Sequence, residues 1–186
     1  MARRPTKYIK KVKDLRARLW PDLSEDELWN HKNFDGFTSI PRTIPIVLSI
    51  IDDLTKGAPA SSTYLELWCR AFPEMYVSLA KPDEHAFYAG FIGQRARRTW
   101  MDRIRKLRDL GFILVAEGSA GELSHSVIIN PHVALKRLKE NNQPGLSKAK
   151  YNALIERGND IGASDVDHDP MEPTQSSNDL DDEIPF

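Results

Sequence analysis

The sequence predicts a mainly α-helical protein with a small β-hairpin, an N-terminal helical extension and a disordered acidic C-terminal tail. Apolar residues recur at helical spacing in several segments, most regularly over about residues 94–110. Two short β-rich runs, 112–116 and 126–129, flank a Gly-containing turn, as in a hairpin. From Gly158 onward the chain is rich in Gly, Ser, Asp and Pro, which is the composition of a flexible tether.

The prediction divides the chain into four segments. These are a basic helical arm over residues 1–36, a central domain over 37–140, a C-terminal helix over 141–158 and an acidic tail over 159–186. In the arm, Trp20-Pro21 ends a helix over 7–19. Ser24 and Glu27 have the spacing of a capping box that starts a short helix near 25–32.

The other elements follow from apolar periodicity and from the positions of Gly and Pro. Thr63 and Glu66 suit the start of a capped helix, and Pro82 suits the first turn of a short one. The segment after Pro73 has no regular pattern. The expected helices span about 42–54, 64–72, 82–91, 94–110, 131–139 and 147–157, and the turn between the two strands spans 117–122.

Charge is distributed very unevenly, although the net charge is only −1. Residues 1–18 contain eight Lys or Arg side chains and one Asp, whereas residues 156–186 contain ten acidic side chains and one Arg. Basic arms bind phosphates and acidic tails repel them, so the two ends of the chain predict opposite electrostatic behaviour.

The helix expected over 94–110 is the first candidate for DNA binding. Its apolar stripe consists of Ala96, Trp100, Ile104 and Leu107, and Gly111 suits its end. The opposite face supplies cations for phosphates and polar groups for base edges in a major groove. The candidate DNA-binding residues there are Gln94, Arg95, Arg98, Thr99, Asp102, Arg105 and Lys106. The alternative is a solvated helix face on which Arg and Asp pair at three- and four-residue spacing.

The order of these elements, two helices, a basic helix and a hairpin over about Ile40 to Leu138, resembles the winged helix-turn-helix family of DNA-binding proteins. The clearest part runs from Arg98 to Ile113, where Leu107 is followed four residues later by Gly111, then Phe112 and Ile113. The resemblance implies that a DNA-recognition helix leads directly into the wing. The segment between Phe72 and Gly93 departs from it, because it is longer than the tight turn expected between two DNA-facing helices.

The N-terminal arm is the second candidate, because its Arg3, Arg4, Lys7, Lys10 and Lys11 would contact phosphates. Aromatic residues are expected in the core rather than as base-stacking platforms. They are Trp20, Trp29, Trp68, Trp100, Phe91 and Phe112.

Several function classes find no support in the sequence. The single Cys69 excludes an internal disulfide framework and a cysteine-based zinc site, and its apolar helical context predicts a buried thiol. The histidines lack the spacing of metal ligands, and no phosphate loop, nucleophile elbow or paired-carboxylate motif occurs. We therefore expect no enzyme, cofactor or metal. No apolar run approaches the ~20 residues of a membrane span, and the N-terminus lacks the apolar core of a secretion signal.

The last residues are Asp181-Asp182-Glu183-Ile184-Pro185-Phe186. They resemble the acidic tip of bacterial single-stranded DNA-binding proteins, which ends Asp-Asp-Asp-Ile-Pro-Phe. The resemblance covers about ten residues, and Glu183 in place of aspartate keeps the charge. It implies that Phe186 enters an apolar pocket of a partner while its carboxylate meets a cation. The alternative is a solvated acidic terminus with no such role.

Together these features predict a DNA-binding adaptor that holds duplex DNA and recruits replication, recombination or repair proteins through its tip. Two alternatives remain: a decoy that inhibits such enzymes, with the central domain as a scaffold, and a plasmid or phage transcriptional repressor. The expected location is the bacterial cytoplasm, and plasmid or phage origin would suit the tail. The sequence leaves the oligomeric state open.

Overall fold

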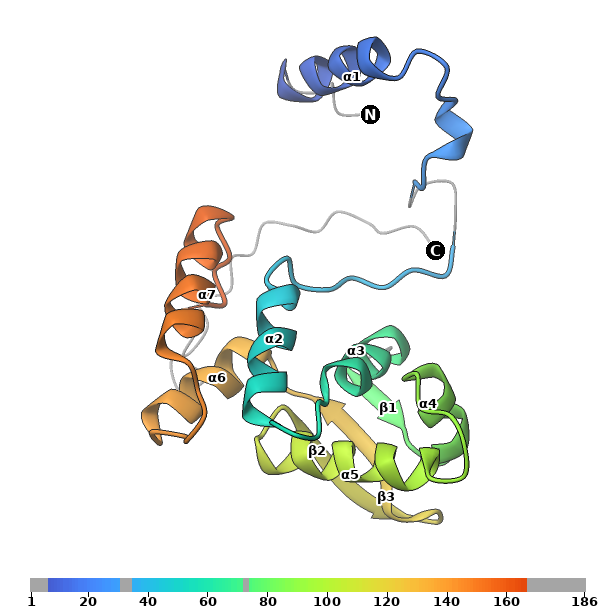
Figure 1. Cartoon of the computed structure of the whole chain (residues 1–186), viewed down its shortest axis with the longest axis vertical. Helices are drawn as coiled ribbons and strands as arrows, with labels where there is room; N and C mark the ends of the chain where they lie inside the picture. The colour runs from blue at the N-terminus through green and yellow to red at the C-terminus, as the bar shows by residue number, and fades with distance from the viewer. Residues whose placement is uncertain (1–6, 31–34, 72–73, 167–186) are drawn as a thin grey trace. The chain divides into compact units, whose positions relative to one another are not determined.

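The computed structural model describes residues 7–30, 35–71 and 74–166. The chain forms two compact units, residues 1–37 and 38–186, which are described separately (Figure 1). The described ranges do not include two of the predicted DNA-binding residues, Arg3 and Arg4, or the tip 181–186. Within the described part, the expectation of a mainly helical chain with a small antiparallel sheet is confirmed. None of the described helices has the length and apolar character needed to cross a membrane.

The first unit contains helix α1 (Lys7–Leu19), which has the predicted bounds, and the 3-10 helix η1 (Glu25–Glu27). The predicted capping box is present: the Ser24 side chain accepts from the Asp26 N–H, and the Glu27 carboxylate accepts from the Ser24 N–H at 2.9 Å. The helix expected over 25–32 is nevertheless only three residues long, because Leu28 already has extended dihedral angles. A cap satisfies the first N–H groups but cannot extend a helix by itself.

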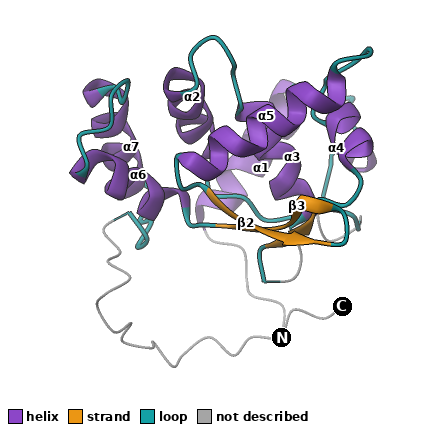
Figure 2. Ribbon diagram, turned by 90° about the horizontal axis from the view of Figure 1, so that it is seen from below, coloured by secondary structure: helices purple, strands orange, loops and turns teal. Residues whose placement is uncertain are grey.

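The second unit contains six helices and one sheet among its described residues. In chain order they are α2 (Ile44–Leu54), α3 (Ser61–Arg70), β1 (Tyr76–Ser78), α4 (Pro82–Tyr88), α5 (Ala96–Asp109), β2 (Ile113–Gly118), β3 (Gly121–Ile128), α6 (Pro131–Glu140) and α7 (Lys148–Asp160). Helices α3, α4 and α5 cover one face of the sheet (Figure 2). Helices α2, α6 and α7 lie together beside them (Figure 1).

The sheet is antiparallel and has the strand order β1-β3-β2. Strand β1 pairs Val77 with Ser126 of β3, and its three residues lie in the segment for which no element was predicted. The hairpin is also longer and its turn tighter than expected, because Gly118 pairs with Gly121. Gly121 has a φ of +101°, which a residue with a side chain rarely adopts.

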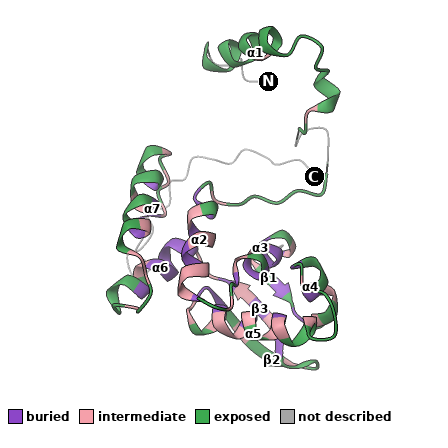
Figure 3. Ribbon diagram, in the orientation of Figure 1, coloured by how far each residue is buried: buried purple, intermediate pink, exposed green. Residues whose placement is uncertain are grey.

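The core forms where α2, α3 and α5 meet the sheet, and buried residues lie along these elements (Figure 3). Its largest fully buried side chains include Trp100, Tyr64 and Phe112. Two of the aromatic predictions are wrong: Trp20 and Trp29 are 58% and 67% exposed. These residues belong to the short first unit, which has too few apolar neighbours to enclose a ring. Cys69 is exposed rather than buried, since it lies on the outer face of α3.

Helix α3 begins three residues earlier than predicted. The Ser61 N–H and hydroxyl both donate to the Asp52 carboxylate, at 3.0 and 2.8 Å, so a side chain from α2 satisfies the start of the helix. The expected cap Thr63 is instead fully buried inside the helix. Its expected capping partner Glu66 turns inward and pairs with His85.

The packed part of the second unit extends further toward the C-terminus than predicted. In α7, Lys150 donates to Ser49 at 2.7 Å and pairs with Asp53 at 2.6 Å, which ties the helix to α2. The tether was expected from Gly158, but α7 continues to Asp160 and Val166 is buried against it. A buried apolar contact of this kind orders the segment that composition alone assigned to the tail.

Candidate nucleic-acid interface

Helix α5 presents the face on which the DNA-binding residues were predicted. Its buried residues Trp100, Ile104 and Leu107 fix which side faces the core. The predicted residues then share the opposite side, because their positions recur every three or four residues. Gln94, Arg95, Arg98 and Asp102 are exposed, and Thr99, Arg105 and Lys106 are half-buried. The helix itself starts at Ala96, so Arg95 is its N-cap residue and Gln94 lies in the preceding turn.

Two arginines near the C-terminal end of α5 already pair with carboxylates. Arg105 pairs with Asp102 at 3.4 Å and with Glu122 at 3.8 Å, whereas Arg108 pairs with Glu122 at 2.8 Å and with Asp109 at 3.0 Å. Hydrogen bonds to Asp109 and Glu122 raise the pKa of the Arg108 guanidinium. Glu122 lies on β3, so one carboxylate joins the hairpin to α5. Its role was not predicted, since only the hairpin register brings it to the helix.

Other cations of this face remain available, two at its N-terminal end and one toward its C-terminal end. In the described part of the chain, the side chains of Arg95, Arg98 and Lys106 form no ion pair. Their neighbours Arg97, Arg105 and Arg108 each pair with a carboxylate. Arg97 pairs with Asp83 at 3.7 Å, and Arg103 donates to the Pro59 carbonyl at 2.9 Å. Cations without a carboxylate partner can exchange water for phosphate at the lowest cost.

A partly buried polar network joins three of the elements around α5. His85 of α4 contacts the Glu66 carboxylate through Nδ1 at 3.0 Å and the Ser78 carbonyl through Nε2 at 2.9 Å. Arg70 pairs with both Glu66 and Glu84. The hydrogen bond from Arg70 lowers the pKa of the exposed Glu84 carboxyl. The network therefore links α3, β1 and α4 next to α5, the candidate DNA-binding helix.

An exposed apolar cluster lies at the junction of α4 and α5, immediately before the available arginines. Phe87, Tyr88 and Ile92 are 66%, 64% and 82% exposed. Gly90 and Gly93 have φ angles of +87° and +83°, so they turn the chain between the helices. The helix predicted here continued to about residue 91. Gly90 and Gly93 were expected to break this helix, and α4 ends at Tyr88, two residues before the first of them.

The N-terminal arm carries its predicted cations on an exposed helix. Lys7, Lys10 and Lys11 are exposed on α1, and so are Val12 and Leu15, which are 46% and 45% exposed. No residue of α1 is buried (Figure 3). The described part of the arm is thus an exposed helix that carries basic side chains, as the sequence indicated.

Metal-ligating groups do not gather anywhere in the described residues: no set of three or more His, Cys, Asp or Glu side chains is placed to hold an ion. Comparison of the chain with protein-family models, with curated proteins and with solved structures gave no match.

Proposed function

We propose that the second unit is a winged helix-turn-helix domain that binds duplex DNA through α5, and that the tip 181–186 recruits DNA-processing proteins. In this assignment α4 and α5 form the helix-turn-helix, and β2 and β3 form the wing. Helix-turn-helix pairs are joined by short turns that often contain glycine, which suits Gly90 and Gly93. The long segment between Phe72 and Gly93, which departed from the family pattern, is accounted for because it contains β1 and α4.

The observation that carries the proposal is the availability of Arg95 and Arg98 at the start of α5. In helix-turn-helix proteins the N-terminal residues of the second helix contact base edges in the major groove. Arginine is the side chain best suited to bridge guanine acceptors there. The two arginines lie at this end of α5, exposed and outside every ion pair of the described residues.

The test of the DNA-binding half compares two double variants with the same change in charge. Arg95→Ala with Arg98→Ala removes the two available cations, whereas Lys81→Ala with Arg97→Ala removes two that already pair with Glu84 and Asp83. Binding of a fluorescent duplex of mixed sequence would be followed by anisotropy. We expect the first variant to bind at least about tenfold more weakly, at ~1.4 kcal/mol per decade, and the second to be weakened much less. An equal weakening in the two variants would contradict a specific role for α5.

The recruiting half rests on the sequence of the tip, which lies outside the described residues. Its test is capture from a bacterial lysate by the intact chain and by a chain without Phe186. The proposal expects helicases, exonucleases or primosome proteins in the first sample only. Capture without DNA binding would favour the decoy, and DNA binding with strong sequence preference but no capture would favour the repressor.

A further inference from the structure

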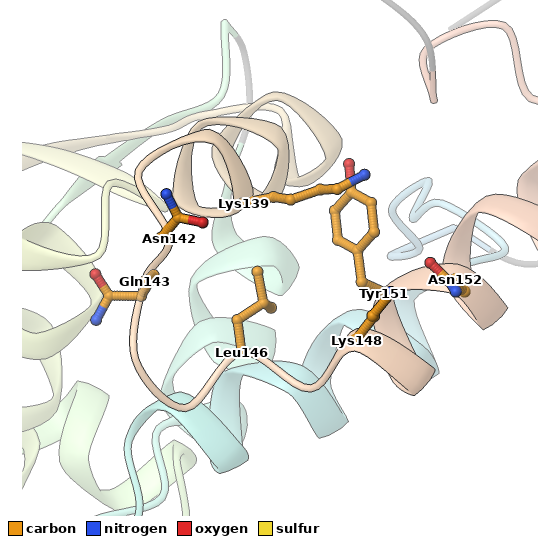
Figure 4. Close-up of a pocket in the computed structure, with 7 residues that line it drawn as sticks. All are labelled: Lys139, Asn142, Gln143, Leu146, Lys148, Tyr151 and Asn152. Carbon is orange, nitrogen blue, oxygen red and sulfur yellow. The ribbon is translucent and has the colours of Figure 1, made fainter.

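A pocket of about 340 Å³ opens between the end of α6 and the start of α7 (Figure 4). Tyr151 and Leu146 supply its apolar surface, and Lys139 and Lys148 stand at its rim. The Lys139 ammonium lies over the Tyr151 ring, 4.5 Å from the ring centroid. The amides of Asn142, Gln143 and Asn152 complete the lining. This site is separate from the polar face of α5.

The lining has the chemistry of a site for an acidic segment that contains an aromatic residue. A pocket of this volume, mostly apolar with a few polar groups at its edge, is typical of small ligand sites. Lys139 and Lys148 are exposed, and within the described residues neither forms an ion pair. An aromatic side chain would bury its ring against Tyr151 while adjacent carboxylates met the two ammonium groups.

The chain itself carries such a segment, and it departs from beside this pocket. Val166, the last described residue, is buried and borders an adjoining pocket that also includes Lys139 and Tyr151. Residues 167–186 contain seven acidic side chains and no Lys or Arg, and Phe186 is their only aromatic residue. A random coil of twenty residues has an average end-to-end distance of roughly 25 Å, so a segment of this length is long enough to reach the pocket.

We propose that the α6–α7 pocket binds the chain's own acidic segment 181–186, with Phe186 against Tyr151 and the carboxylates near Lys139 and Lys148. Because the segment is tethered at Val166, its effective concentration at the pocket is of the order of millimolar. Even a weak contact is then substantially occupied. The segment stays bound in the pocket until a partner competes for it. This does not depend on whether the partners are those of the adaptor proposed above.

The test uses full-length protein and no DNA or partner, so its outcome is independent of the proposed function. A fluorescein-labelled peptide of residues 177–186 is titrated against the Phe186→Ala protein, whose own tail lacks the aromatic group. The same titration is made in that background with Lys148→Glu and, as a matched charge control, with Lys81→Glu. Lys148 lies in the first turn of α7, where an acidic residue favours the helix, so the fold is retained.

The proposal expects the peptide to bind the Phe186→Ala protein and the Lys81→Glu control equally well. Binding should be at least about tenfold weaker with Lys148→Glu, and also weaker with the intact chain, whose own segment competes. A peptide with an amidated C-terminus measures how much the terminal carboxylate adds. Equal binding to the Lys148→Glu and Lys81→Glu proteins would overturn the proposal. It would mean that the peptide responds only to the net charge of the protein, or that it binds the basic faces of α1 and α5. Absence of binding would overturn it as well.

Discussion

The imidazole of His85 stacks on the indole of Trp100, with the ring centroids 5.1 Å apart and the planes 15° from parallel. Trp100 is the fully buried anchor of α5, and both nitrogens of His85 are held by oxygen acceptors of Glu66 and Ser78. One side chain of α4 therefore fixes the rotation of α5 relative to three other elements. The direction in which Arg98 points depends on this packing.

Replacing His85 with Ala should destabilise the second unit. The change opens a cavity against Trp100 and leaves the Glu66 carboxylate, which is only 5% exposed, with Arg70 as its remaining partner. Breaking a buried pair of this kind costs about 3 kcal/mol, which urea unfolding would measure.

A double-mutant cycle separates the two contributions. If the Glu66 contact matters, the effects of His85→Ala and Glu66→Gln should be strongly non-additive. Additive effects would mean that His85 acts only by filling space beside Trp100.

Replacing Glu122 with Gln should increase DNA affinity. The change removes the carboxylate that Arg105 and Arg108 share. Arg105 keeps Asp102 and Arg108 keeps Asp109, but the face of α5 loses one negative charge. The decrease in stability should stay below about 1 kcal/mol, since these ion pairs are exposed.

Glu117→Gln provides the control for this increase. Glu117 is an exposed carboxylate of the same hairpin that forms no ion pair within the described residues. Anisotropy with the same duplex should show a larger increase in affinity for Glu122→Gln than for Glu117→Gln. Identical increases would mean that only the net charge changes, and that the geometry of the pairs is irrelevant.

The arm should contribute affinity that depends on salt but not on sequence. Replacing Lys7, Lys10 and Lys11 with Gln removes cations from the exposed face of α1. For each DNA phosphate that the variant no longer neutralises, the slope of log affinity against log salt should fall by about 0.9. A slope that stays the same in the variant would place DNA away from the arm.

Replacing Gly158 with Ala tests the packing of Val166, because the change in stability should be negative if Val166 packs on α7 and positive if it does not. Alanine is normally better than glycine inside a helix by up to about 1 kcal/mol. Here a Cβ at position 158 would lie 2.2 Å from Cγ2 of Val166, so the side chain of Val166 must move. We expect lower stability and faster hydrogen exchange in residues 161–166. A stabilised protein would show that Val166 does not pack on α7.

The features that could be predicted well from the sequence are those set by local pattern. Helix α5 was found because its apolar stripe and the glycine at its end lie within one segment, and Gly111 has the expected left-handed φ of +77°. The starts of α2 and α7, expected near residues 42 and 147 and found at Ile44 and Lys148, follow from local signals in the same way. The outward face of α5 was therefore predictable residue by residue.

The features that were missed depend on residues far apart in the chain. Strand β1 has only three residues, and its pairing with β3 defines it. Glu66 has the spacing of a cap, but a histidine nineteen positions later determines its role. The pairing of Glu122 with two arginines likewise requires the hairpin register. Apolar periodicity within a short stretch of sequence gives no information about contacts between residues far apart in the chain.

The unequal pairing along α5 also gives the molecule a preferred direction of approach to a polyanion. Arg95 and Arg98 at the start of α5 form no ion pair in the described part of the chain, whereas the hairpin turn carries Glu117 and Glu122 and no cation between them. Long-range fields orient charged molecules before they touch. A duplex that binds as proposed would thus meet the start of α5 first, with the hairpin held away from the phosphates. The same helix would bind DNA in one orientation rather than two.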